Sequence, residues 1–157
     1  KLQLFHPESG LIGENLYMDL DVVILKNIDK MAKFGFTDTF GALHDFTGTT
    51  GINSSIMKFN NITMTPAVWD RYYEDRPRWR KYQGDQNVTY EFMKNHPELE
   101  YMPNEWSFSY KWFTRKEPRF HKNDWTFEKD SESLVAVFHG NPNPHESDVD
   151  WVLDNWK

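Results

Sequence analysis

Apolar residues gather in three short runs that predict buried β-strands. The runs are "LYMDLDVVIL" at 16–25, "SSIMKF" at 54–59 and "SLVAVFH" at 133–139. Each run is short and mostly apolar, as expected of strands in a sheet that is largely covered. We therefore expect a central sheet built from segments that are far apart in the sequence.

Three other segments predict helices. One covers 66–74, with Thr65 as its cap and Pro66 in its first turn; the second covers 86–95, and the third covers 148–156. Residues 95–129 mix Pro, Trp and charged residues without a clean period, which indicates loops and short edge strands. No repeat or linker interrupts the chain. The pattern predicts one α/β domain with an irregular second half.

Composition narrows the class of protein. The chain has 157 residues, and 38% hydrophobic content with 12 Phe, 7 Tyr and 7 Trp is enough to form a core. A net charge of -6 argues against nucleic acid as a partner, because phosphate binding needs a basic surface. The absence of Cys excludes disulfides and thiolate metal sites. No apolar run reaches the roughly 20 residues of a membrane span, so we expect a cytoplasmic protein.

Asp19 and Asp21 interrupt the first apolar run, where burial of a carboxylate is costly. Residues two apart in a strand point the same way, and a bend at a strand end would let both reach one cation. Carboxylates suit Mg(II) or Mn(II), which usually keep open positions for phosphate groups. The motif therefore indicates phosphate chemistry at a metal. The alternative is a pair of aspartates on a solvated strand edge.

Three later stretches contain further polar residues at the ends of predicted elements. His139 and Gly140 follow the last apolar run in "VAVFHGNPNPHE". Polar clusters also occur in "GINSSIMKFN" and "GDQNVTYEFM". With "YMDLDVVILKNID", these four motifs stand in an order that resembles metal-dependent glycosyltransferases of the GT-A fold. The resemblance covers about 16–156 and is nearest to the glycogenin and lipopolysaccharide-galactosyltransferase type, with its phage or marine relatives.

The resemblance implies a donor site and a metal site. Asp19 and Asp21 match the D-x-D motif that holds Mn(II), or Mg(II), against the diphosphate of a nucleotide sugar, and His139 matches the histidine that completes the metal site. Gly140 matches the glycine beside that histidine. The implied donor is a nucleotide sugar, with a UDP-sugar favoured, and the acceptor is a glycan or another hydroxyl compound.

The same resemblance implies residues around the transferred sugar. Asn53 and Ser54 match a turn that lines the sugar pocket, while Asp85 and Gln86 match a pair beside the anomeric carbon, with transfer that retains its configuration. The family often has Lys where this chain has Asn141 or Asn143. Lys111 in "SYKW" is a candidate substitute that would neutralise the leaving diphosphate.

The resemblance also implies an expectation about domain organisation. In such enzymes a nucleotide-binding half of about a hundred residues precedes the D-x-D motif, and it contains βαβ units. Only 18 residues precede Asp19 here, which is too few for one such unit of about 30 residues. We therefore expect residues 1–157 to be the C-terminal part of a Rossmann-like GT-A catalytic domain. As an isolated fragment, we expect it to be poorly soluble, to bind no nucleotide and to be inactive.

Two other functions fit parts of the sequence. "DLDVVI" also fits the nucleophile motif of haloacid-dehalogenase-type phosphatases, with Asp19 as nucleophile and Asp21 as acid and base. The 17% aromatic content is compatible with a carbohydrate-binding module that needs no metal. Local structural roles are open as well, because His139 could be a hydrogen-bonded structural histidine and Asp85 could cap a helix.

Overall fold

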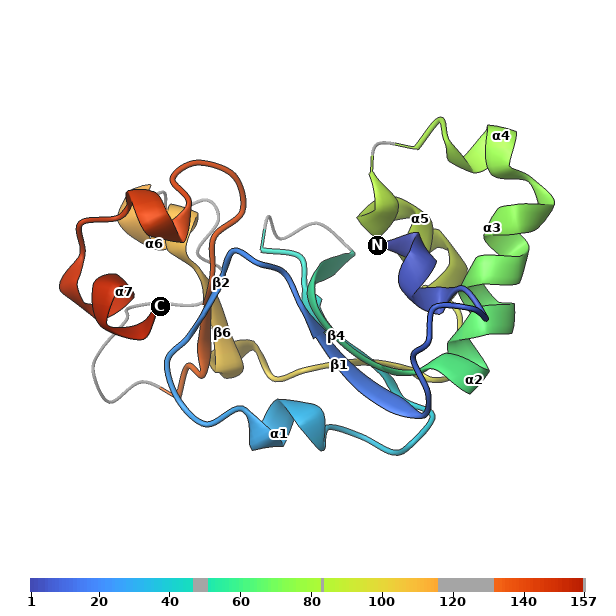
Figure 1. The fold of residues 1–157 in the computed structure, drawn as a ribbon, viewed down its shortest axis with the longest axis horizontal. Helices are drawn as coiled ribbons and strands as arrows, with labels where there is room; N and C mark the ends of the chain where they lie inside the picture. The colour runs from blue at the N-terminus through green and yellow to red at the C-terminus, as the bar shows by residue number, and fades with distance from the viewer. Residues whose placement is uncertain (47–50, 83, 116–131, 157) are drawn as a thin grey trace.

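Two small β-sheets with helices on their outer faces make up the molecule (Figure 1). The structure is a computed structural model that describes residues 1–46, 51–82, 84–115 and 132–156. The four-stranded sheet has the order β1 (Glu14–Met18), β4 (Ile52–Asn60), β3 (Phe40–His44), β5 (Leu99–Tyr101). The three-stranded sheet has the order β2 (Val22–Ile24), β7 (Val135–Val137), β6 (Ser107–Ser109).

Most strand pairs are antiparallel. β4 runs antiparallel to both β1 and β3, and β2 runs antiparallel to β7. The two parallel pairs are β3 with β5 and β6 with β7. The sequence prediction missed β3, whose residues "FGALH" form a short apolar stretch outside the three runs that it selected.

The predicted single strand over 16–25 is wrong, because this run forms two strands in different sheets. β1 ends at Met18 and β2 begins at Val22, with Asp19 and Asp21 in the connection between them. The backbone N–H of Val22 donates to the carbonyl oxygen of Asp19 at 3.3 Å, which closes a turn. Because Asp19 and Asp21 lie in this turn, neither side-chain carboxylate has to be buried within a strand, where its desolvation would be costly. Both carboxylates can instead reach solvent or a cation.

The predicted strand over 54–59 is confirmed and is longer than expected. All nine residues of β4 are buried, because both faces of the strand are covered. Met57 and Phe59 contribute to a core shared with the helices, whereas Ile56 contributes to a second core that includes residues of the three-stranded sheet. Successive side chains of β4 point to opposite faces of the sheet, so this strand contributes to both cores.

A continuous helical run follows β4 and begins earlier than predicted. It consists of α2 (Asn61–Met64), the π-helical segment η2 (Thr65–Asp70) and α3 (Arg71–Glu74). The predicted cap at Thr65 is wrong. The side chain of Asn60 caps the helix by accepting from the backbone N–H of Ile62 at 3.1 Å. Thr65 instead donates its hydroxyl to the carbonyl oxygen of Phe5 at 2.9 Å.

The other predicted helices form with shifted ends. The segment predicted at 86–95 is α5 (Asp85–Met93), and that predicted at 148–156 is α7 (Asp150–Asn155). The irregular region contains β5 and β6, both at sheet edges, and the helix α6 (Tyr110–Arg115), which the sequence did not predict. Residues 116–129 of that region lie outside the described residues. The remaining short helices are η1 (Leu2–Phe5), α1 (Asp29–Ala32), α4 (Arg76–Trp79), η3 (Asn104–Trp106) and η5 (Pro144–Glu146).

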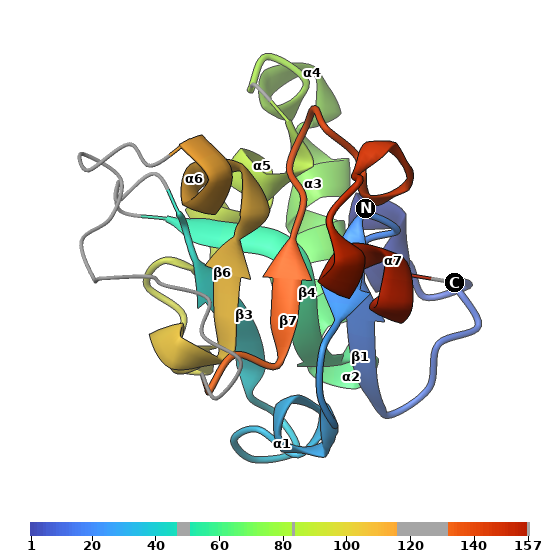
Figure 2. The ribbon, with the colours of Figure 1, turned by 90° about the vertical axis from the view of Figure 1, so that its left-hand side faces the viewer.

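Three apolar cores hold these layers together. The first joins β3 and β4 to η1, α2, η2 and α5, and the second lies between the two sheets with Met31 of α1. The third joins the outer face of the three-stranded sheet to Val152 of α7, the helix at the right of Figure 2. Within the described ranges, no helix has the length and apolar character to cross a membrane.

Candidate functional site

Strand pairing brings the D-x-D turn next to the end of β7. The carbonyl oxygen of Asp21 accepts from the backbone N–H of Phe138 at 2.9 Å, and β2 continues this pairing through Val22 and Val137. His139 follows Phe138 directly. On the other side of the turn, the backbone N–H of Asp19 donates to the carbonyl oxygen of Ser55 in β4 at 2.8 Å. Segments from three separate parts of the sequence therefore meet at one point.

The carboxylate of Asp19 has two close partners. The ammonium group of Lys1 lies 2.6 Å from its Oδ2, and the hydroxyl of Tyr17 donates to its Oδ1 at 2.6 Å. The side chains of Lys1 and Asp19 are only 22% and 19% exposed, so this ion pair is shielded from solvent more than a typical surface pair. Burial, together with the hydrogen bond and charge of Asp19, raises the pKa of Tyr17 well above its ordinary value. Tyr17 is therefore a permanent donor to Asp19.

Lys1 also connects the D-x-D turn to the start of α5. Its Nζ donates to the hydroxyl of Ser54 at 3.0 Å and to the Ser54 carbonyl oxygen at 3.2 Å. Oε1 of Gln86 accepts from the backbone N–H of Ser54 at 3.0 Å. The structure thus brings Ser54, Asp85 and Gln86 to Asp19, with the backbone nitrogen of Lys1 3.0 Å from Oδ2 of Asp85.

Asp85 is the first residue of α5 and not its cap. The N-cap is Gly84, whose φ of +94° lies in the region that favours glycine. Partial burial alone would raise the pKa of Asp85, but its contacts with Lys1 and a hydrogen bond from the backbone N–H of Gln86 hold it below its ordinary value. Asp85 is consequently a carboxylate at neutral pH. The alternative local role as a helix cap does not apply.

Asn53 has a structural role within β4. Its side-chain oxygen accepts from the backbone N–H of Ser55 at 2.9 Å, and the residue is buried. It lies where the register between β3 and β4 shifts, next to the position at which Ser55 pairs with the D-x-D turn. Its predicted contact with a sugar stays a prediction.

His139, Gly140 and Lys111 form a second group on the β7 side of the turn. The ring of His139 contacts the hydroxyl of Ser109 through Nε2 and stacks near Phe46, with centroids 5.9 Å apart and planes at 13°. Gly140 has a φ of +85°, and a Cβ atom placed on it would lie 3.6 Å from Nζ of Lys111. The structure therefore places the amino group of Lys111 beside the "HG" motif, and its predicted role as a substitute for the family's lysine stays a prediction.

The donor set at the turn suits a divalent cation in part. Partial burial, and then the neighbouring charge of Asp19, raise the pKa of Asp21 above its ordinary value. Two carboxylates that repel one another in a half-buried turn are stabilised by a cation between them. Within the described part of the chain, no three His, Asp or Glu side chains come close enough together to form a metal-binding group. The predicted three-ligand set of Asp19, Asp21 and His139 is therefore not assembled in these residues, and the carboxylate of Asp19 is paired with Lys1.

Lys1 and Tyr17 are site residues that the sequence reasoning missed. Tyr17 was counted only as an apolar residue of the first run, and Lys1 belongs to no motif. Both line a pocket of about 600 Å³, within the usual size range of small-molecule sites, although Asp19 is not among its lining residues. Its other lining residues are Gln3, Leu4, His6, Glu8, Ser9 and Leu11. A sequence signal for Tyr17 was available. Tyr17 and Asp19 are two residues apart, and this spacing in a strand places the hydroxyl and the carboxylate on the same face.

The sequence matches no protein-family model and no curated protein. Solved structures do match the fold over nearly the whole chain. The glycosyltransferase GlyE of Streptococcus pneumoniae superposes with a TM-score of 0.66 at 16% identity, covering 98% of this chain and 43% of GlyE. The galactosyltransferase LgtC, solved with donor and acceptor sugar analogues, gives 0.63 at 12% identity and covers 99% of this chain and 66% of LgtC.

Mouse xyloside xylosyltransferase 1 also matches, with a TM-score of 0.56 at 17% identity over 90% of this chain and 61% of the mouse protein. The chain therefore spans between 43% and 66% of the length of these three proteins. At sequence identities this low, the structural matches establish the fold alone. The chain is a mixed α/β protein whose structure matches glycosyltransferases of the GT-A fold, which confirms the fold predicted from the sequence.

Proposed function

We propose that this chain is the catalytic region of a glycosyltransferase that moves a sugar from a nucleotide-diphosphate sugar to a hydroxyl acceptor. The observation that carries the proposal is the contact of Lys1 with both Asp19 and Ser54, which joins the D-x-D turn to Asp85 and Gln86. The fold similarity supports the same reading. The donor favoured by the sequence is a UDP-sugar.

The leaving diphosphate gains negative charge when its bond to the sugar breaks. Asp19 and Asp21 would hold Mn(II) or Mg(II), and that ion would neutralise charge on the diphosphate. Lys111, beside Gly140, is positioned to add a second positive charge on the β7 side. In this proposal His139 is a third metal ligand, which requires its ring to exchange the contact with Ser109 for the ion.

When the bond to the diphosphate breaks, positive charge develops at the anomeric carbon of the sugar, and nearby groups must stabilise it. Asp85, whose pKa is held below its ordinary value, is a carboxylate at neutral pH and lies at the start of α5 next to Gln86. The Oε1 atom of Gln86 is occupied by the backbone N–H of Ser54, so its NH₂ group is the part that can face a substrate. We assign Asp85 to charge stabilisation and Gln86 to orientation of the sugar.

The test is donor hydrolysis by the full-length protein. UDP- and GDP-sugars are incubated with and without Mn(II), and release of the nucleoside diphosphate is measured. We expect Mn(II)-dependent release of UDP that Asp21→Ala abolishes. Release of phosphate from p-nitrophenyl phosphate, with no release from any donor, would instead support the phosphatase alternative. Binding of glycans without donor turnover would support a carbohydrate-binding module.

A further inference from the structure

A strongly basic segment lies directly before the proposed site. Residues 76–82, "RPRWRKY", contain four basic side chains and no acidic one, in a chain whose net charge is -6. The four basic residues are Arg76, Arg78, Arg80 and Lys81, and all are exposed. None of them forms an ion pair with another residue of the described ranges. Their charges are therefore available to a ligand.

Aromatic rings fix part of this basic segment in position. The guanidinium of Arg76 lies 4.4 Å from the ring centre of Tyr73, and that of Arg78 lies 4.7 Å from the ring centre of Trp79. Trp79 itself packs edge-on against Phe92 of α5, with centroids 4.5 Å apart. Stacked guanidinium groups keep their N–H edges free for hydrogen bonds. The segment is thus held against the helix that carries Asp85 and Gln86.

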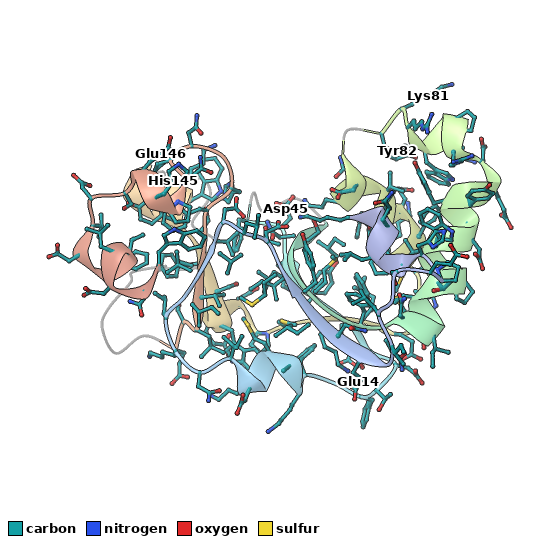
Figure 3. The ribbon with its side chains drawn as sticks, in the orientation of Figure 1. Glu14, Asp45, Lys81, Tyr82, His145 and Glu146 are labelled. Carbon is teal, nitrogen blue, oxygen red and sulfur yellow. The ribbon has the colours of Figure 1, made fainter. Side chains whose placement is uncertain are left out.

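The distance to the proposed site is short along the chain. Lys81 is four residues before Asp85, so their Cα atoms are at most about 14 Å apart. The connection runs from α4 to the start of α5 on the side of the molecule where the amino terminus lies (Figure 1). Figure 3 shows Lys81 at the outer end of this connection and Tyr82 below it. A substrate that extends from Gln86 by two or three sugar units would reach the segment.

We propose that residues 76–82 bind an anionic group on the acceptor, and therefore that the acceptor carries phosphate or carboxylate. This inference rests on the proposed function. A protein with net charge -6 and three aspartates at its site repels an anionic substrate, so a local basic segment is needed to attract one. Arginine matches the geometry of phosphate and carboxylate oxygens.

A membrane surface is the competing partner for a basic and aromatic segment. The acceptor is favoured because the segment continues into Asp85 without an intervening element and is packed onto α5 through Trp79. Glu74 and Asp75 directly precede the segment, and their exposed carboxylates would oppose binding to anionic lipid. A single anionic group on a soluble acceptor can avoid these carboxylates.

The test compares two sugars that differ only in a phosphate. Binding of maltose and maltose 6′-phosphate to the full-length protein is measured by calorimetry, in the native protein and in Arg80→Gln/Lys81→Gln. This double variant leaves the two stacked arginines in place. Lys30→Gln/Lys33→Gln, which removes two exposed charges on and after α1, is the matched control. Hydrolysis of UDP-sugar donors in the absence of acceptor is measured on all three proteins.

We expect the native protein and the control to prefer maltose 6′-phosphate. Arg80→Gln/Lys81→Gln should lose about tenfold in affinity for it, while maltose binding and donor hydrolysis stay unchanged. Equal binding of both sugars by the native protein, or a preference that survives in the double variant, would overturn the inference alone. Loss of binding to phosphatidylglycerol vesicles without any sugar-phosphate preference would assign the segment to a membrane. If no donor is hydrolysed, the proposed function fails, and the acceptor role fails with it.

Discussion

The ammonium group of Lys1 is 2.6 Å from Oδ2 of Asp19 and 3.0 Å from the hydroxyl of Ser54. One cation therefore bridges the D-x-D turn and β4, whose Ser54 donates its backbone N–H to Gln86. Because Asp19 also accepts from Tyr17, both of its oxygens are engaged before any ligand arrives. In the proposed function, a divalent cation on Asp19 would therefore have to exchange with the ammonium group of Lys1.

Lys1→Met should lower turnover without unfolding the protein. The substitution keeps the length of the side chain but removes the charge that faces Asp19 and Ser54. We expect kcat for donor hydrolysis to fall by about a hundredfold, the usual effect of losing one preorganised donor. Steady-state kinetics of UDP-sugar hydrolysis measure this. Lys30→Met on α1 is the control, and an equal fall in that variant would contradict a local role for Lys1.

Asp21→Asn should remove the effect of a divalent cation on stability. Binding to the native state alone adds about 2.7 kcal/mol at a hundredfold excess over Kd. We expect Mn(II) to raise the melting temperature of the native protein and of the exposed control Asp154→Asn, but not that of Asp21→Asn. Differential scanning fluorimetry with and without Mn(II) gives the comparison. The same Mn(II) shift in all three proteins would place the metal elsewhere.

Gln86→Ala and Gln86→Glu should differ in stability but agree in kinetics. Alanine leaves the backbone N–H of buried Ser54 without its acceptor, which costs about 1 kcal/mol or more, whereas glutamate keeps an oxygen for it. Both remove the NH₂ group that orients the sugar, so both should lower kcat more than they change KM. Urea unfolding and steady-state kinetics test this pair. A pure rise in KM would make Gln86 a binding residue only.

Glu14→Ala should destabilise the fold through Lys58. The Lys58 side chain is 1% exposed, and its Nζ lies 2.7 Å from the carboxylate of Glu14, a residue labelled in Figure 3. Without Glu14, the ammonium group of Lys58 would be a buried charge with a missing partner. Because Glu14 is half exposed, water can replace part of the lost contact with its carboxylate. We expect a loss of about 1–2 kcal/mol, below the 3–5 typical of fully buried pairs. Lys58→Met in the Glu14→Ala background should recover most of it in urea unfolding, and no recovery would show that the pair is not the cause.

His44 should make stability depend on pH. His44 is exposed at the end of β3, but partial desolvation lowers its pKa below the usual value, and its ring stacks on Tyr101 with centroids 3.9 Å apart. The unfolded chain then binds more protons than the native state, so this stability is present above about pH 6.5 and is lost as the pH falls toward the lowered pKa. His44→Phe keeps the stack and should reduce the loss of unfolding free energy between pH 7.5 and pH 5. The exposed control His145→Gln should keep the native slope, and equal slopes in all three proteins would exclude His44.

Local pattern determined that the segments of β4 and β7 form strands and that those of α5 and α7 form helices. The runs at 54–59 and 133–139 are apolar enough that any compact fold must bury them, and β4 and β7 contain most of these residues. The D-x-D, "DQ" and "HG" motifs were also recognisable, because each depends on residues that are adjacent in sequence. The predicted GT-A fold followed from their order.

Tertiary structure decided what a local pattern does not contain. The run at 16–25 reads as one strand, yet long-range pairing of Tyr17 with Met57 and of Val23 with Ala136 assigns its halves to different sheets. Lys1 meets Ser54 across 53 residues of sequence, and no spacing rule links them. Strand pairing and ion pairs between distant segments depend on the closure of the whole chain, and only folding brings their partners together.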